Sequence, residues 1–376
     1  MGSGKILILG GYGTTGRLLA RLLLQETDIE LVLAGRNIQR AEKTADELNA
    51  SFPGKRVTAA CADASDAESL QQAMAGVIMV AVASSTSQYA GSVAQAAILA
   101  GVDYFDVQYS SAKLGTLRML RPEIEAAGRC YITDGGFHPG LPAAMIRWAA
   151  PHFDRLQSAN VGSVIKVDWR SLEFSPETIE ELVSEFMDFK NLIFKNGQWQ
   201  PGGILSWLLP KWMDFGSRFG RQYTIPMFLE EMRPIPDLYL HLEETGFYVG
   251  GFNWFVDWII SPLVMILPKI FPRKGIQLSS NMMAWGLRKF SKPPYGTMLR
   301  LDARGIKDGQ PADLDITLYH EDGYMLTAIP AAACLRQYLD GSIRKPGLWL
   351  QALAVEPDRL MKDMQRMGVE MLVNDL

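Results

Sequence analysis

Short apolar runs alternate with longer amphipathic stretches along the first third of the chain. The apolar runs predict β-strands at 5–9, 31–34, 57–61, 77–82, 104–107 and 130–133. The stretches between them predict helices at 15–25, 39–49, 69–75, 89–100 and 122–127. Parallel strands need crossover connections, so this alternation predicts an α/β fold with a doubly wound parallel Rossmann sheet.

The pattern changes after Asp134. Partial alternation of apolar and polar residues at 160–174 and 297–330 predicts strands of a mainly antiparallel sheet with one covered face. An aromatic-rich region punctuated by prolines, about 186–295, lies between these stretches, and the remaining tail has a mainly helical pattern. The second half of the chain is therefore expected to be an α+β domain.

A chain of 376 residues is long enough for two domains. We expect a dinucleotide-binding Rossmann domain over 1–134 and a substrate or dimerisation domain over 135–330. The helical segment over 331–376 is expected to return to the Rossmann domain.

Composition narrows the class of protein. The formal net charge of −4 gives no overall basic excess to neutralise phosphates, so nucleic acid is not an expected partner. Three distant cysteines predict no disulfide framework, and four histidines without ligand spacing predict no metal site. Neither a signal peptide nor a membrane-spanning segment is expected, and the cysteine usage favours the cytoplasm.

A glycine-rich loop joins the first predicted strand to the first predicted helix. Its pattern Gly11-x-Gly13-x-x-Gly16 matches the dinucleotide-binding fingerprint in the required context. Glycines permit a tight turn and close approach of a pyrophosphate, whose charge the helix N-terminus stabilises. A merely tight strand–helix turn is the alternative, and it explains poorly why so many glycines cluster. The predicted contacts are Gly10, Gly11, Gly13, Thr14, Thr15 and Gly16.

The end of the second predicted strand indicates which cofactor is bound. An NAD site usually carries an acidic residue there, whereas this chain has Arg36, followed one helical turn later by Arg40. Two guanidinium groups suit a 2′-phosphate, so NADP is favoured over NAD, although both arginines could be ordinary solvated charges. Further cofactor contacts are predicted at Asn37, Asp63, Ser84 and Ser85.

Two residues are candidate proton donors for hydride chemistry. Tyr109 follows the fifth predicted strand, at the carboxyl edge where ligands bind in open α/β sheets. If the segment to Lys113 is helical, the two side chains share a face and the ammonium lowers the pKa of the phenol. His138 lies in a glycine-proline turn at the expected domain junction. The alternatives are a tyrosine that caps a strand and a histidine that hydrogen-bonds the turn.

Three segments resemble the saccharopine dehydrogenase-like family of oxidoreductases. These are "GGYGTTGRLLARLL" in the glycine loop, "GVDYFDVQYSS" at 101–111 and "DGGFHPGLP" at 134–142. The tail "GSIRKPGLWLQALAVEPDRLMKDM" is similar to the family's segment that returns to the nucleotide domain. The resemblance implies a Rossmann fold, NAD(P)-linked hydride transfer and carbon–nitrogen bond chemistry.

The chain also departs from the family pattern. His138 stands where the crossover motif often carries an aspartate, and the middle region lacks a cluster of arginines for a dicarboxylic amino acid. Saccharopine is therefore not the expected substrate. We predict a homodimeric NADP-dependent oxidoreductase that transfers hydride to or from a C=N, C=O or C=C bond of a small or apolar substrate. The alternatives are an NADP-sensing regulatory protein without turnover and a scaffold at a membrane surface.

Residues 190–272 interleave aromatic residues with cations. The cations are Lys195, Lys211, Arg218 and Arg221, and the second part of the segment places Trp254, Phe255 and Trp258 before Lys269, Arg273 and Lys274. Apolar bodies with cationic edges are typical of peripheral membrane helices, and tryptophan favours the interfacial zone. A domain core, a dimer contact and a pocket for a long apolar substrate are the alternatives.

Overall fold

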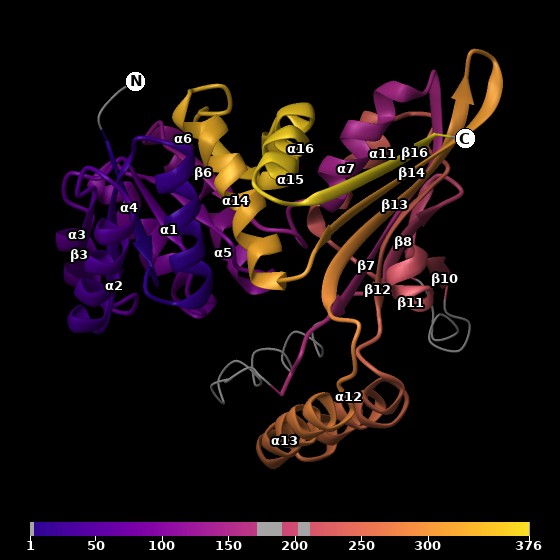
Figure 1. Ribbon diagram of the computed structural model, residues 1–376, viewed down its shortest axis with the longest axis horizontal. Helices are drawn as coiled ribbons and strands as arrows, with labels where there is room; N and C mark the ends of the chain where they lie inside the picture. Colours follow the sequence, from indigo (N-terminus) through magenta and orange to yellow (C-terminus); the bar gives the residue numbers. More distant parts are fainter. Residues whose placement is uncertain (1–3, 171–189, 202–210, 376) are drawn as a thin grey trace. The chain divides into compact units, whose positions relative to one another are not determined.

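The computed structural model describes residues 4–170, 190–201 and 211–375 (Figure 1). The chain divides into two compact units. Unit 1 comprises Met1–Ala144 with Tyr324–Val369, and unit 2 comprises Met145–Gly323 with Glu370–Leu376.

Unit 1 is built on a seven-stranded sheet in the order β15-β6-β5-β4-β1-β2-β3, with every neighbouring pair parallel. The strands are β1 (Lys5–Leu9), β2 (Glu30–Gly35), β3 (Val57–Cys61), β4 (Met79–Val82), β5 (Asp103–Asp106), β6 (Cys130–Thr133) and β15 (Gly347–Leu350). Strands β4, β5 and β6 are buried throughout, as expected for a parallel sheet covered on both faces. The predicted doubly wound Rossmann sheet is confirmed, and its strand order reverses between β1 and β4.

Helices connect these strands or follow them in the chain. They are α1 (Thr14–Glu26), α2 (Ile38–Ser51), α3 (Ala67–Ala73), α4 (Ala90–Ala100), α5 (Ser111–Met119), α6 (Arg121–Ala126), α14 (Gly323–Leu339), α15 (Gln351–Ala354) and α16 (Pro357–Arg366), with α7 (Pro142–Ala149) at the boundary of the units. Polar side chains cap several N-termini: Asn37 accepts from the N–H of Arg40, and Ser110 accepts from the N–H of Lys113.

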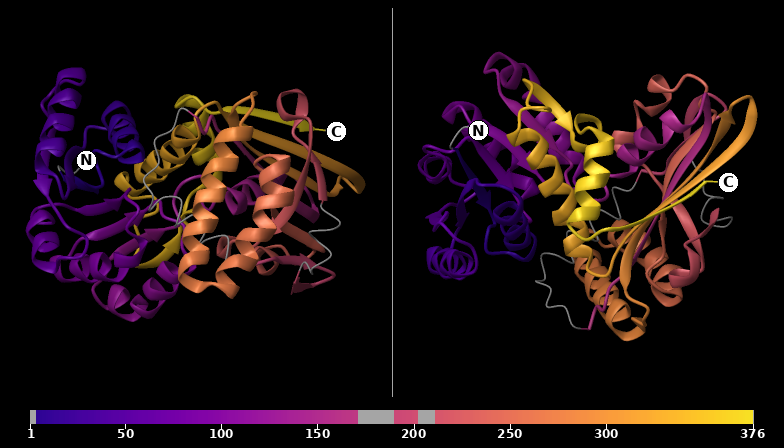
Figure 2. Two further views of the ribbon diagram at one scale, coloured as in Figure 1. Left: turned by 90° about the horizontal axis from the view of Figure 1, so that it is seen from below. Right: turned by 45° about the horizontal axis from the view of Figure 1, so that its top comes forward.

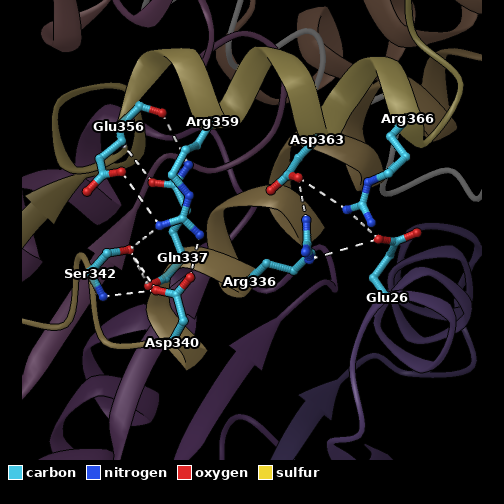
Figure 3. A network of polar contacts seen from close by, with 9 residues as sticks. All are labelled: Glu26, Arg336, Gln337, Asp340, Ser342, Glu356, Arg359, Asp363 and Arg366. Carbon is cyan, nitrogen blue, oxygen red and sulfur yellow. Dashed lines mark hydrogen bonds and ion pairs between the residues drawn. The ribbon is translucent and has the colours of Figure 1, made fainter.

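The tail 324–369 is part of unit 1 through a polar network as well as through β15 (Figure 3). Arg366 of α16 lies 2.5 Å from a carboxylate oxygen of Glu26 at the end of α1, and Arg336 of α14 pairs with Asp363 of α16. The side chain of Gln337 accepts from the N–H of Glu356 at 2.8 Å and donates to its carbonyl at 3.2 Å. These contacts hold the tail against the first helix of the sheet.

Unit 2 contains a nine-stranded sheet whose main path is β10-β11-β12-β7-β13-β14-β16, with β8 pairing with β12 and β9. The strands are β7 (Arg155–Lys166), β8 (Leu192–Lys195), β9 (Gln198–Pro201), β10 (Lys211–Asp214), β11 (Arg221–Met227), β12 (Glu244–Gly250), β13 (Gly296–Lys307), β14 (Gln310–His320) and β16 (Glu370–Asp375). Only the β7–β12 pair is parallel among the described strands, so the predicted mainly antiparallel sheet is confirmed.

One strand prediction is wrong at its end. The stretch 297–330 was expected to be extended, but residues from Gly323 onward form helix α14. Its buried residues include Leu326, Ala328 and Ile329. A short, almost continuous apolar run has the same appearance in a buried strand and in a buried helix, so periodicity cannot separate them. The end of the other predicted stretch, 171–174, lies outside the described residues.

A helical hairpin lies between β12 and β13. A single π-helical turn (Val256–Ile260) leads into α12 (Ser261–Ile270), which lies beside α13 (Pro272–Phe290) (Figures 1 and 2). A small apolar core of Val256, Ile260, Val264, Met283 and Leu287 joins the two helices. No helix in the described part of the chain is long and apolar enough to cross a membrane.

Candidate functional site

The glycine loop between β1 and α1 is shaped by contacts that exclude side chains. Gly10 has a φ of +85°, a conformation that favours glycine, and its carbonyl accepts from the N–H of Gly13 at 2.9 Å. A Cβ on Gly16 would lie only 2.3 Å from the same carbonyl oxygen. The loop therefore requires glycine at these positions for a packing reason that is independent of any ligand.

The loop leaves the N-terminus of α1 open to an anion. Gly13 is the N-cap in an extended conformation, so no side chain caps the helix, and its first turn contains no acidic residue. The first N–H groups of a helix have no carbonyl partner within that helix. Together with the helix dipole they form a site suited to a pyrophosphate, bordered by the predicted residues Thr14 and Thr15.

Loops after two other strands meet the glycine loop. A Cβ on Gly10 would lie 2.7 Å from Cβ of Ser84, because β4 neighbours β1 in the sheet. The Gln108 amide donates to the Ser84 carbonyl at 2.5 Å, and the hydroxyl of Ser84 lies 3.0 Å from that of Thr86. The structure thus brings the predicted residue Ser84 to the loop, with the exposed Ser85 beside it. Gln108 and Thr86 were not predicted from the sequence.

The carboxyl end of β2 presents the two predicted arginines to solvent. Arg36 and Arg40 are both exposed, and the Arg40 guanidinium lies 4.9 Å from the centroid of the Tyr12 ring. The Tyr12 hydroxyl accepts from the backbone N–H of Asn37 at 3.2 Å, which joins the glycine loop to the start of α2. Tyr12 was not among the predicted cofactor contacts, although it lies between Gly11 and Gly13 in the sequence.

Asp63 follows β3 at the same edge of the sheet. Its carboxylate accepts from the N–H of Ser65 at 2.9 Å and from the hydroxyl of Ser65 at 2.7 Å. These hydrogen bonds, with a smaller contribution from Arg36, lower the pKa of the Asp63 carboxyl. Asp63 is therefore an ionised acceptor near the predicted cofactor residues at neutral pH.

A buried ion cluster lies behind the carboxyl ends of β5 and β6. The Lys113 ammonium, fully buried, lies 2.7 Å from a carboxylate oxygen of Asp106 and 2.7 Å from one of Asp134, and it also donates to the carbonyl of Gln108. The hydroxyl of Thr133 donates to the second oxygen of Asp106 at 2.6 Å. Three acceptors take up the three donors of the ammonium, so Lys113 holds the two aspartates together.

Burial and the neighbouring charges determine the pKa values in this cluster. Desolvation opposes the charge on Lys113, but Asp106 and Asp134 more than offset it and raise the pKa of the ammonium. Burial raises the pKa of Asp134 despite the attraction of Lys113. The cluster was not predicted from the sequence, where Asp106 and Asp134 lie in the motifs at 101–111 and 134–142 without an assigned role.

The expected pairing of Tyr109 with Lys113 on one helical face is wrong. Helix α5 begins at Ser111, and its N-cap Ser110 is extended with a φ of −166°, so Tyr109 precedes the helix. The ammonium of Lys113 is also engaged by two carboxylates and a carbonyl. Tyr109 is half-buried at the end of β5, where the prediction placed it.

His138 lies in the turn after β6 and is half-buried. Its ring contacts that of Phe137 edge-on, with 4.0 Å between centroids. Burial lowers the pKa of the His138 imidazole to about 4, so the ring is neutral at pH 7. The Gln351 amide, from the tail, donates to the carbonyls of Gly136 at 3.0 Å and Gly140 at 3.3 Å. Gln351 therefore fixes the turn that carries His138.

Within residues 4–170, 190–201 and 211–375, no three His, Cys, Asp or Glu side chains gather in a way that could hold a metal ion. The donor atoms at the site are instead backbone N–H groups, guanidinium groups and hydroxyls. Such donors suit phosphate rather than a cation.

These features define a class. A parallel sheet with a glycine loop at the topological switch point and an uncapped helix behind it is a dinucleotide-binding Rossmann domain. Residues 6–132 match the family model of the saccharopine dehydrogenase NADP-binding domain. The matched residues run from β1 to β6 of unit 1 and include the glycine loop.

Solved structures extend the likeness to the whole chain. The apo saccharopine dehydrogenase (L-Glu forming) from Saccharomyces cerevisiae is 15% identical over 100% of both chains, with a TM-score of 0.71. The two proteins therefore share a fold over their full length. A meso-DAP dehydrogenase mutant from Clostridium tetani is 12% identical over 95% of both chains, with a TM-score of 0.46. The comparison with curated proteins finds no match to the sequence.

Proposed function

We propose that the protein is an NADP-dependent oxidoreductase of the saccharopine dehydrogenase type. It would transfer hydride to or from a C=N, C=O or C=C bond of a small or apolar substrate. The observation that carries the proposal is the glycine loop at an uncapped helix N-terminus, with two exposed arginines after β2 where an NAD site usually has an acid. The match to an NADP-binding domain family supports the same cofactor.

Different residues of unit 1 would bind different parts of the cofactor. The N–H groups from Gly11 to Gly16 would hold the pyrophosphate, and Arg36 and Arg40 would pair with the 2′-phosphate. The ring of Tyr12 lies against Arg40 and would orient that guanidinium. When bound, the cofactor supplies or accepts the hydride.

The protein's own part of the chemistry is to move a proton. The Tyr109 phenol would donate its proton to the oxygen, nitrogen or second carbon of the substrate double bond, while the hydride adds to the other carbon. His138, neutral at pH 7, would accept a proton in the opposite direction or hydrogen-bond the substrate. Lys113 would act as a positioning residue, because its ammonium fixes the aspartates at the ends of β5 and β6.

Replacing Arg36 with aspartate is expected to move the preference from NADPH towards NADH. The change removes a cation from the 2′-phosphate and offers an acceptor to a 2′-hydroxyl. A charge-assisted contact to phosphate contributes about 1.5–3 kcal/mol, so NADPH affinity should fall by about one to two decades. Dissociation constants of both nucleotides, measured by calorimetry on the wild type and on Arg36→Asp, provide the check.

Arg304→Asp is the matched control, because it makes the same charge change at an exposed arginine of unit 2. Its nucleotide affinities should equal those of the wild type. Equal affinities of the wild-type protein for NADPH and NADH would refute the NADP preference.

Tyr109→Phe and His138→Gln are expected to retain NADPH binding and lose turnover. General acid–base catalysis contributes about 10²–10⁴-fold, so kcat should fall within that range. The assay follows NADPH absorbance with panels of small oxo acids, imines and long-chain carbonyl compounds. Full kcat in both variants would exclude them as proton donors. NADPH binding without turnover of any compound would favour the NADP-sensing alternative.

A further inference from the structure

The helical hairpin of unit 2 exposes an unusual amount of apolar surface. More than half of the large hydrophobic side chains that are exposed in the described part of the chain lie within 254–285. They are Trp254, Trp258, Ile259, Leu263, Ile266, Ile270, Phe271, Ile276, Leu278 and Trp285. A concentration of exposed apolar side chains in one segment indicates a contact with a protein or a membrane.

Helix α12 and the turn before it carry two apolar stripes. One stripe, which includes Val264, is buried in the core shared with α13. The other consists of Ile259, Leu263, Ile266 and Ile270, at spacings of four, three and four residues, and these side chains are 37% to 60% exposed. A helix that packs on one side only normally presents polar residues on its outer face. The second stripe is therefore left uncovered by the described residues.

An aromatic cluster presents two indole rings to solvent beside this stripe. The rings of Phe255 and Phe290 stack at 4.5 Å between centroids, and Trp254 and Trp285 contact Phe290 edge-on at 6.1 and 5.8 Å. Trp254 is 63% exposed and Trp285 is 53% exposed. Indoles held in this way, with an apolar body and a polar N–H, favour the headgroup region of a bilayer.

The charge of the hairpin is strongly one-sided. Residues 252–292 contain six basic residues, Lys269, Arg273, Lys274, Arg288, Lys289 and Lys292, and a single acid, Asp257. The carboxylate of Asp257 accepts from the hydroxyl of Tyr223 and from the N–H of Phe252. Its carboxylate is thus engaged within the protein, and the net charge of the hairpin segment is positive.

Two of these cations, Arg288 and Lys289, meet Arg170 in a groove at the C-terminal end of α13. The groove has a volume of about 680 Å³ and is lined by Arg170, Asn281, Ala284, Trp285, Arg288 and Lys289. The Arg170 guanidinium donates to the carbonyl of Arg288 at 3.1 Å, which holds the cations together. Like charges gathered in this way favour an anionic ligand.

We propose that the α12–α13 hairpin docks on the surface of an anionic phospholipid membrane. The outer stripe of α12 enters the interfacial zone, the indoles lie at headgroup depth, and the groove at the end of α13 binds lipid phosphate. The helices lie on the membrane rather than crossing it, in keeping with their length and hydropathy. The charge favours this occupant over a second copy of the chain, because two basic hairpins repel each other.

Co-sedimentation of the full-length protein with vesicles tests the proposal. We expect binding to vesicles of phosphatidylcholine mixed with phosphatidylserine, little binding to phosphatidylcholine alone, and weakening by salt. Each cation near an anionic surface contributes about 1 kcal/mol, so reversing two with Arg288→Glu and Lys289→Glu should lower partitioning by about tenfold or more. Ile266→Glu with Ile270→Glu should abolish it, because two charges would enter the apolar zone.

Matched variants elsewhere in unit 2 control for charge and for surface leucines. Arg304→Glu with Lys307→Glu makes the same charge reversal on β13, and Leu238→Glu with Leu240→Glu changes two exposed leucines outside the hairpin. Both controls should sediment like the wild type, and circular dichroism should show all variants folded. Absence of binding to anionic vesicles, or equal loss in hairpin and control variants, would overturn the proposal. A loss of oligomeric state in the stripe variants, with vesicle binding unchanged, would instead assign the stripe to a second copy of the chain.

Discussion

Lys113→Met is expected to lower the free energy of unfolding by about 3–5 kcal/mol, because it leaves buried carboxylates without their cation. In the native protein the ammonium lies 2.7 Å from oxygens of both Asp106 and Asp134, and all three groups are buried. Methionine matches the length and apolar stem of lysine, so the charge is the principal change. Urea unfolding followed by circular dichroism measures the effect.

The pH dependence of the free energy of unfolding provides a second test on Lys113→Met. Without Lys113, the folded-state pKa of Asp134 should lie further above its unfolded value, since burial already raises it in the wild type and the attraction of the ammonium is lost. An acid of this kind favours the folded state when protonated, and its contribution is lost as pH rises. The loss in free energy of unfolding caused by Lys113→Met should therefore be smaller at pH 5 than at pH 8.

Arg121→Met is the control for removal of a paired cation at the surface. Its exposed pair with Glu125 spans i to i+4 on α6 and should contribute less than about 1 kcal/mol. Adding Asp134→Asn to Lys113→Met should restore part of the lost stability, since one buried charge disappears. If Lys113→Met costs no more than Arg121→Met, the cluster does not have the energetic role assigned to it.

Gly16→Ala is expected to weaken NADPH binding by about 100-fold. The new Cβ would lie 2.3 Å from the carbonyl oxygen of Gly10, a distance that forces the loop to move. Losing two charge-assisted hydrogen bonds from the helix N-terminus to the pyrophosphate costs at least about 3 kcal/mol, which corresponds to that factor. Titration of NADPH followed by its fluorescence provides the measurement.

Gly115→Ala is the matched control, because a Cβ at this position on α5 would meet no atom within 4 Å. It should leave NADPH affinity unchanged and raise stability by up to about 1 kcal/mol, as alanine favours a helix over glycine. Wild-type affinity in Gly16→Ala would show that the nucleotide does not bind at this loop.

The sequence predicted most of the fold of unit 1 because its signals are local. Apolar runs of strand length separated by amphipathic stretches describe a parallel sheet wherever they alternate. The glycine spacing after β1 identified the loop, since the turn itself demands those residues. Around Gly323 the local signal was ambiguous, and the predicted strand became the buried helix α14.

The sequence by itself thus determined the α/β class, the nucleotide loop and the mainly antiparallel second sheet, all of which follow from short-range periodicity. Only the tertiary structure decided the partners of Lys113, because Asp106 and Asp134 lie 28 residues apart and meet only when β5 and β6 pair. It also decided which stripe of α12 is covered. An apolar residue has the same appearance in sequence whether it packs against its own chain or faces outward, and only long-range packing separates the two.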